Sequence, residues 1–386
     1  MKDAIYFDHA ATTPVSPLVI QTMTEVLTQD FGNPSSIHQF GRKTYKLLTE
    51  ARNAIAKNLL VKDSEIIFTS GGTESNNAAI IGTAFKKQID GKHLITTAIE
   101  HPSVLQTMKY LKEQFGFEVT YLPVDEKGNL AVEMFKQALR EDTILVSVMA
   151  ANNETGNLLP IQEIGEILRN HQAIFHTDAV QAMGLQQVDP KDLGVDLLSA
   201  SAHKLNGPKG VGFLYKRANL SFTPFLHGGE QEGRFRAGTE NLASIVGFKK
   251  AIEILSQNER KQRFKKYQTL QDLLFRRLDE AKVRYYLNGD LNNKLPNILN
   301  LHLEKVASNL TLMKLDLKGF AISIGSACTA GNISDSHVLA AMYGKDHPAL
   351  KQSIRISFGE GNTKEQVEKL ANELIALSQK TNKEKK

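Results

Sequence analysis

The sequence predicts an α/β protein with a mostly parallel sheet in a large domain, joined to a smaller α+β domain. Over roughly the first 240 residues, short apolar runs alternate with segments of helical periodicity, which is typical of a parallel sheet covered by helices. A charged helical stretch at about 241–282 contains no strand signal. Beyond it, short strand-like runs reappear between helices, and this change of pattern indicates a second domain.

The strands of the large domain are predicted from runs that are rich in apolar and β-branched residues and are bounded by turn residues. In chain order the runs are EIIFTSG (65–71), HLITTAI (93–99), EVTYLPV (118–124), TILVSVMA (143–150), AIFHTDA (173–179), VDLLSASA (195–202) and GVGFLYK (210–216). Helical segments begin after Thr73, Pro102 and Pro160 and lie between these runs. The last two runs are separated only by a Gly-rich segment, so an antiparallel hairpin is the alternative for that pair.

The smaller domain is predicted to comprise residues 1–14 and 256–386, with the large domain at 15–255. Its strands are RYYLNG, NILNLHL, FAISIGSA and SIRISFG. Its last helix begins with a capping box formed by Thr363 and Gln366. The apolar face of that helix contains Val367, Leu370, Leu374 and Leu377. The sequence IYF near the N-terminus is another strand, and the domain that it joins is left open.

Length and composition exclude several classes of protein. The chain has 386 residues, so two or three domains are expected, and its single cysteine excludes an intrachain disulfide, a CxxC redox pair and a thiolate zinc cluster. The net charge of +5 favours acidic partners only weakly, and no direct nucleic-acid partner is expected. The lysines of the C-terminal SQKTNKEKK are interpreted as a solvated end rather than an RNA-contacting arm. No apolar run approaches the ~20 residues of a membrane span, and the amino-terminal residues MKDAIYFDHAATT lack the long apolar region of a signal peptide, so we expect a cytoplasmic protein without membrane contact.

The first candidate site follows the strand at 65–71, where Gly71, Gly72 and Thr73 lead directly into a helix. Backbone N–H groups at a helix N-terminus can bind a phosphate. The alternative is an ordinary glycine turn with Thr73 as the N-cap. Neither a GxxxxGKS/T nor a GxGxxG motif follows a strand, so a phosphorylated cofactor smaller than a nucleotide is favoured.

Two further strands carry polar residues at their carboxyl ends, where ligands gather in open α/β sheets. Asp178 and Gln181 follow a strand so apolar that an unpaired carboxylate would be costly there, although Asp178 could instead cap the next helix. Ser201, His203 and Lys204 end the following strand. Desolvation of Lys204 would lower its pKa toward the range needed for a Schiff base with a carbonyl cofactor. Because buried lysines are rare, we favour a functional role for Lys204.

A lysine, a carboxylate and a phosphate-binding turn are together the groups that a pyridoxal phosphate site requires. The motifs YFDHAATTP, NPSS, SGGTESNN, EHPS, NNETG, HTDAVQ, SAHKLNGPKG, RAGTEN and IGSACT occur in this order from about residue 5 to residue 360. On these motifs the chain resembles the cysteine desulfurases (NifS/IscS-like), which are class V members of the fold-type I pyridoxal phosphate enzymes. The resemblance implies a fold-type I transferase fold and an enzyme that takes sulfur from L-cysteine and leaves L-alanine.

The resemblance also assigns a cofactor site. It implies that Lys204 forms the Schiff base with pyridoxal phosphate and later moves the Cα proton of the substrate. Asp178 is expected to face the pyridine nitrogen and Gln181 the ring hydroxyl, and His101 is expected to stack on the ring and take part in acid–base steps. The phosphate is expected to contact Gly72, Thr73, Ser201 and His203, together with Thr239 of a second subunit. The resemblance therefore implies a homodimer with shared active sites.

At the substrate end the resemblance places Asn153, which also contacts the cofactor, and Arg355, whose guanidinium can hold a carboxylate with two hydrogen bonds. Taken without the family, Arg355 indicates a surface charge on an edge strand, and NNETG indicates a turn. No metal site is expected, because neither HExxH nor a comparable spacing occurs.

The single cysteine, Cys328, comes after an apolar run that ends at Ser326 and is followed by the small polar residues TAGNISDS, so we place it at the start of a loop. A lone cysteine in an apolar run is more often an inert core residue than a reactive one. The resemblance, which is to group I desulfurases, instead makes Cys328 the sulfur acceptor. Its persulfide would pass to acceptor proteins for tRNA thiolation or iron–sulfur cluster assembly. Because the C-terminal end is short, we expect tRNA thiolation partners at least as much as an iron–sulfur scaffold protein.

Several alternatives stay open on the sequence. Another class V enzyme, an aminotransferase or a selenocysteine lyase, would keep Lys204 and Asp178 but would not need Cys328. A cysteine hydrolase lacks a local nucleophile signature here. A binding protein that uses the fold for RNA or partner contact would be colourless, whereas a Schiff base at Lys204 predicts a yellow protein.

Overall fold

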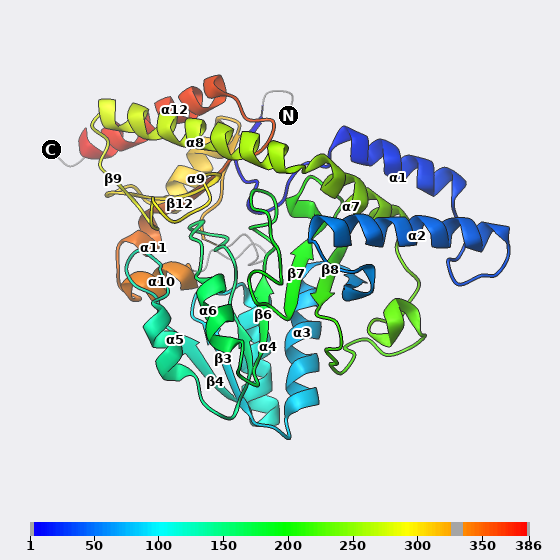
Figure 1. Cartoon of the computed structure of the whole chain (residues 1–386). Helices are drawn as coiled ribbons and strands as arrows, with labels where there is room; N and C mark the ends of the chain where they lie inside the picture. The colour runs from blue at the N-terminus through cyan, green and yellow to red at the C-terminus, as the bar shows by residue number, and fades with distance from the viewer. Residues whose placement is uncertain (1–3, 326–334, 384–386) are drawn as a thin grey trace.

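The computed structural model describes residues 4–325 and 335–383, and in this part of the chain a seven-stranded sheet forms the centre (Figure 1). The strand order is β2-β8-β7-β6-β5-β3-β4. The strands are β2 (Ile66–Thr69), β3 (His93–Thr97), β4 (Glu118–Leu122), β5 (Thr143–Ser147), β6 (Ile174–Asp178), β7 (Leu197–Ser201) and β8 (Gly212–Lys216). The five strands from β7 to β4 pair in parallel, whereas β8 lies antiparallel to both β7 and β2. The mostly parallel sheet is thus confirmed, and so is the hairpin alternative for its last two runs.

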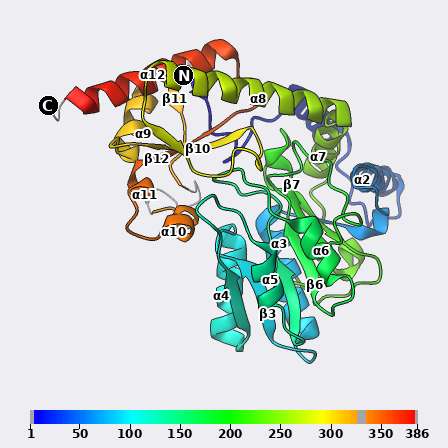
Figure 2. The ribbon, with the colours of Figure 1, turned by 60° about the vertical axis from the view of Figure 1, so that its left-hand side comes forward.

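Helices cover both faces of this sheet because its strands are apolar on both sides. Leu94 and Leu197 of the strands pack in one core cluster with α3 and α4, whereas their neighbours Ile95 and Leu198 belong to the cluster on the other face. The second cluster includes α7, whose Phe248 stacks on a strand residue. Figure 2 shows the sheet between these layers. The helices are α1 (Pro17–Gln29), α2 (Gln39–Asn58), α3 (Gly72–Lys87), α4 (Pro102–Phe115), α5 (Val132–Ala138), α6 (Ile161–Leu168) and α7 (Leu242–Ile254).

The remaining elements form two small sheets and the helices around them. An antiparallel sheet has the order β12-β10-β9, and β1 pairs in parallel with β11. These strands are β1 (Ile5–Tyr6), β9 (Tyr285–Leu287), β10 (Ile298–Leu303), β11 (Phe320–Ala321) and β12 (Ser353–Ser357). The helices are α8 (Gln257–Glu280), α9 (Ser308–Leu317), α10 (His337–Tyr343), α11 (Ala349–Gln352) and α12 (Lys364–Lys383). In Figures 1 and 2, α8 and α12 lie side by side across the top.

Three sequence expectations can be compared with this arrangement. The N-terminal strand, whose partner was open, joins the C-terminal part of the chain through β11. The strand predicted for FAISIGSA is shorter than expected, because pairing with β1 covers only Phe320–Ala321. The capping box at the start of α12 is confirmed, since Thr363 and Gln366 each accept a backbone N–H from the other. The boundaries between the two predicted domains stay a prediction.

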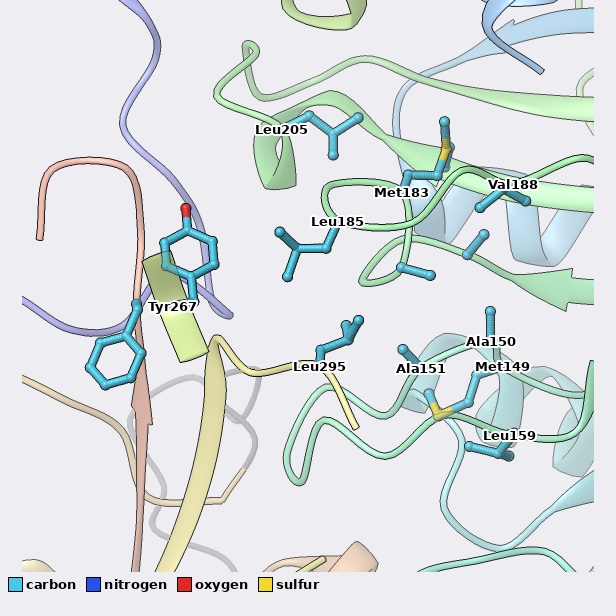
Figure 3. Packing of buried hydrophobic residues seen from close by; sticks show 14 of the residues in the cluster. Met149, Ala150, Ala151, Leu159, Met183, Leu185, Val188, Leu205, Tyr267 and Leu295 are labelled. Carbon is cyan, nitrogen blue, oxygen red and sulfur yellow. The ribbon is translucent and has the colours of Figure 1, made fainter. Parts of the chain in front are cut away.

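Buried apolar side chains hold the loops at the carboxyl ends of the central strands. Figure 3 shows Met149 after β5, Met183 and Leu185 after β6, and Leu205 after β7 in one core region with Leu295, which precedes β10. All five side chains are buried. Loops anchored in this way can hold polar residues in fixed positions.

No helix in the described parts of the chain combines the length and the apolar character that crossing a membrane requires.

Candidate active site

A cavity of about 320 Å³ lies at the carboxyl ends of β6 and β7 and contains most of the residues singled out from the sequence. Ten of the twelve line it: Gly72, Thr73, His101, Asn153, Asp178, Gln181, Ser201, His203, Lys204 and Arg355. Thr239 is exposed and is not among the lining residues. Cys328 lies outside the described residues. The volume is in the range of small-molecule sites.

Lys204 extends into this cavity from a short 3-10 helix, Ala202–Lys204, that directly follows β7. Its Nζ donates hydrogen bonds to the backbone carbonyls of Ala10 and Ala11. Gln181 donates from Nε2 to the same Ala10 carbonyl, at 3.0 Å. The N-terminal segment therefore forms one wall of the cavity. Ala10 and Ala11 lie in the sequence motif YFDHAATTP, but the motif alone did not predict that their backbone carbonyls line the cavity.

Asp178 ends β6, and a network of hydrogen bonds holds its buried carboxylate. Asn76 Nδ2 donates to Asp178 Oδ2 at 2.8 Å, and the backbone N–H of Val180 donates to Oδ1 at 3.0 Å. The same Asn76 amide group also donates to Ser103 Oγ at 2.9 Å. Sequence reasoning missed Asn76 and Ser103, although both lie inside quoted motifs, SGGTESNN and EHPS. Only the folded chain reveals that they share one hydrogen-bonded network with Asp178.

His101 is the N-cap of α4 and faces the cavity. Its Nδ1 accepts the backbone N–H of Ser103 at 3.1 Å, so the proton of the neutral ring lies on Nε2. Burial lowers the pKa of His101, and the charge of Lys204 adds to this effect while Asp178 opposes it. Burial and Lys204 also lower the pKa of His203, to about 4. Both imidazoles are therefore neutral at neutral pH.

The phosphate-binding turn predicted from the sequence has the backbone that such a turn needs. Gly71 has φ +149°, a conformation that other residues rarely adopt, and α3 begins at the next residue, Gly72. A Cβ on Gly72 would lie 2.9 Å from a methyl carbon of Val180, so any side chain here would require Val180 to move. The N-terminal end of α3 thus borders the cavity beside Thr73 and Ser201, and it can bind an anion.

Arg355 reaches the cavity from β12, far from the central sheet in sequence, and its side chain is buried. Its Nη2 forms an ion pair with Asp8 Oδ1 at 2.8 Å, and its Nη1 donates to the backbone carbonyl of Asn153 at 3.0 Å. Among the described residues, Arg355 Nε and the side-chain oxygen of Asn153 have no hydrogen-bond partner. The interpretation of Arg355 as a surface charge, which followed from the strand pattern alone, is wrong: β12 is an edge strand, but this residue is fully covered.

The NNETG motif does form a turn. Asn152 Oδ1 accepts the backbone N–H groups of Glu154 and Thr155, at 2.8 and 2.9 Å. Its amide group donates to the carbonyl of Ile99, next to the segment that carries His101. This turn therefore connects Asn153, which lines the cavity, to the segment that carries His101.

A seven-stranded α/β fold with a lysine directly after a buried strand, facing a carboxylate and an anion-binding helix end, is the arrangement of a pyridoxal phosphate enzyme. The chain belongs to the class V aminotransferase family, since the profile of the family described as Aminotransferase class-V matches residues 5–370.

Individual relatives narrow this class. The chain is 52% identical to the "Putative cysteine desulfurase IscS 1" of Bacillus subtilis (strain 168), over 96% of this chain and 97% of that one. A solved structure titled "NIFS-LIKE PROTEIN" superposes with a TM-score of 0.90 at 36% identity and covers 97% of this chain and 98% of that one. The structure titled "SspA in complex with cysteine" has a TM-score of 0.81 at 36% identity, with 92% and 98% coverage. The predicted fold-type I transferase fold is thereby confirmed.

Enzymes of this family depend on pyridoxal phosphate, and the cavity fits that group. The cofactor carries an anionic phosphate and a basic pyridine nitrogen, and the cavity offers a helix N-terminus for the first and the carboxylate of Asp178 for the second. Within the described residues no cluster of side chains suits a metal ion.

Proposed function

We propose that this chain is a cysteine desulfurase, which removes the sulfur atom of L-cysteine and releases L-alanine. One observation carries the proposal: a single cavity is lined by Lys204, Asp178, the N-terminal end of α3 and the buried Arg355. An amino acid substrate needs both a carbonyl cofactor at its amine and a cation at its carboxylate. The relatives named as cysteine desulfurases, and the relative solved with cysteine, favour this reaction over transamination or selenocysteine cleavage.

Different residues around the cavity would contact different parts of the cofactor. Asp178 would keep the pyridine nitrogen protonated, and Asn76 orients the carboxylate for this contact. Gly72, Thr73, Ser201 and His203 would hold the phosphate. Bound pyridoxal phosphate supplies an electron-withdrawing ring that stabilises negative charge at the substrate Cα. Lys204 would hold the cofactor, and its Nζ would accept the Cα proton of the substrate.

The substrate end is formed by Arg355 and Asn153. Asp8 holds one nitrogen of the guanidinium, which leaves the planar group oriented toward the cavity for a carboxylate. The neutral ring of His101, with its proton on Nε2, can donate a hydrogen bond from that atom to negative charge that develops in the cavity. Cys328 is proposed as the residue that takes the substrate sulfur as a persulfide.

Further parts of the proposal concern partners. A homodimer would bring the exposed Thr239 of one subunit to the phosphate site of the other. The persulfide would pass to acceptor proteins for tRNA thiolation or iron–sulfur cluster assembly, and the protein would act in the cytoplasm. The large and small domains would divide at residues 15 and 255.

Changing Cys328 to alanine tests the proposed reaction. We expect sulfide release from L-cysteine and reductant to fall by at least about a hundredfold, because the nucleophile for the substrate sulfur is lost. The variant should stay yellow, since Lys204 is untouched. Sulfide and alanine are quantified together, and wild-type protein should yield equal amounts of the two. Ser326→Ala, two residues away, serves as the control and should retain both products. Sulfide release at the wild-type rate in Cys328→Ala would exclude the mechanism.

A second test addresses Asn76. Replacing it by alanine removes the amide that donates to Asp178 and should weaken retention of pyridoxal phosphate by roughly tenfold to a hundredfold, as expected for a lost hydrogen bond to a buried charge. The pH dependence of the visible absorbance should shift as well, because Asp178 keeps only one of its two donors. The adjacent Asn77→Ala is the matched control, since that side chain contacts the backbone of α3 and Thr107 instead. Unchanged retention and absorbance in Asn76→Ala would show that Asp178 does not depend on it.

A further inference from the structure

The segment between β8 and α7 contains three successive residues in the left-handed backbone region. They are Glu232, Gly233 and Arg234, with φ of 48°, 62° and 71°. Two of them carry side chains, and such residues adopt this conformation only where their surroundings impose it. In Figure 1 this light green segment lies on the α2 side of the molecule. Specific contacts must therefore stabilise this backbone conformation.

The side chain of Glu232 supplies these contacts. It is 1% exposed, and its two oxygens each accept a hydrogen bond from Arg52 of α2 at 2.7 Å. One of these oxygens also accepts the backbone N–H of Phe68 at 2.8 Å, and Arg52 donates to the carbonyl of Ile66 at 2.6 Å. Because β2 is an edge strand, this ion pair satisfies backbone groups that no neighbouring strand reaches. We call Glu232 and Arg52 the edge clamp.

Two further contacts fix the rest of the segment. Arg236 Nε forms an ion pair with Glu74 of α3 at 3.0 Å, and the backbone N–H of Gly238 donates to the side chain of Gln231 at 3.1 Å. The next residue, Thr239, is exposed and does not line the cavity of its own chain. The segment that precedes Thr239 is therefore held by contacts with α2, β2 and α3 and by a hydrogen bond within itself.

We propose that the edge clamp positions Thr239 for the phosphate site of a second copy of this chain. The inference rests on the homodimer of the proposed function and adds Glu232 and Arg52 as positioning residues that touch neither cofactor nor substrate. A donor held in place before binding avoids the loss of freedom that ordering a loose loop would cost. Breaking the clamp in one subunit should therefore weaken cofactor retention in the other.

The test compares holoenzymes by the rate at which they release pyridoxal phosphate after dilution. Glu232→Ala and Thr239→Val should each release the cofactor at least about tenfold faster. Thr239→Val removes the hydrogen bond to the phosphate, and Glu232→Ala removes the support that positions it; one such hydrogen bond corresponds to about a tenfold change in affinity. Glu230→Gln is the matched control, because Glu230 forms an ion pair with Arg234 on the same segment but is exposed. Where Glu232→Ala fails to fold, the double variant Glu232→Leu with Arg52→Met removes both charges and keeps the apolar volume. Circular dichroism and melting temperature report whether each variant is folded.

Hybrid dimers then determine which subunit the clamp serves. One protomer carries Glu232→Ala and the other Lys204→Ala, so only the first protomer can link the cofactor to a lysine, and the second supplies an intact clamp. Slow, wild-type release from this hybrid supports the proposal. Fast release means that the clamp acts within its own chain and overturns it, as does wild-type release from a folded Glu232→Ala homodimer. If Thr239→Val alone behaves as wild type while Glu232→Ala releases quickly, the assignment of Thr239 in the proposed function fails and the clamp does not act through it.

Discussion

Lys204→Ala should be colourless after addition of pyridoxal phosphate and should form neither sulfide nor alanine from L-cysteine. The substitution removes the amine that holds the cofactor and accepts the Cα proton, so turnover should fall by more than about 10⁴-fold. The fold should survive, because the substitution removes hydrogen bonds of Lys204 to the carbonyls of Ala10 and Ala11 but no side chain of the hydrophobic core. Visible absorbance, product yields and the melting temperature measure the three effects.

Lys209→Ala is the control for this change. Lys209 lies one turn further along, is exposed and does not line the cavity, so its loss should affect neither colour nor products. A yellow, active Lys204→Ala protein would disprove the assignment of the cofactor lysine. Loss of colour in both variants would indicate that cofactor binding depends on the total positive charge of this loop rather than on Lys204 itself.

Arg355→Ala should raise the KM for L-cysteine by about a hundredfold or more, with a smaller change in kcat. The guanidinium is the buried cation that faces Asn153 in the cavity, and a charge-assisted, two-point contact with a carboxylate is lost. Arg355→Lys should also raise KM, by about tenfold or more, because an ammonium keeps the charge but not the planar fork. Stability should fall in the alanine variant, since Asp8 loses its partner.

Two comparisons separate binding from folding at this position. Asp8→Asn removes the ion pair of Arg355 but leaves the guanidinium, so its KM should change less than that of Arg355→Ala. Arg284→Ala, at an exposed arginine next to β9, should leave both KM and melting temperature unchanged. A wild-type KM in Arg355→Ala would show that the substrate carboxylate binds elsewhere.

The local elements were predictable from the sequence because their signals are local. Each central strand was recognised as a short apolar run, and the helix at the C-terminus was recognised from its capping box and the spacing of its leucines. The Gly-rich segment between β7 and β8 left an antiparallel hairpin as the alternative for that pair, and the antiparallel pairing confirms this alternative. The cavity residues Lys204 and Asp178 also follow directly from strand ends, where parallel sheets collect ligands.

Contacts between distant segments were beyond this kind of reasoning. Asn76 and Ser103 lie on different helices, and only their packing shows that one amide group joins them to Asp178. Glu232 has an ordinary sequence environment, yet its side chain is almost fully buried against the edge of β2. Neither periodicity nor motif spacing contains information about such pairs, because they depend on which surfaces meet after the helices pack.

Short stretches of the sequence therefore determine which segments form strands and helices. They also determine the α/β class and the chemistry of the cavity. Backbone hydrogen bonding and apolar periodicity act over a few residues, so they can be recognised locally. The burial of Arg355, the wall formed by Ala10 and Ala11, and the pairing of β1 with β11 depended on tertiary packing. Each of these joins segments that lie far apart in the sequence, and such contacts form only when the hydrophobic cores bring those segments together.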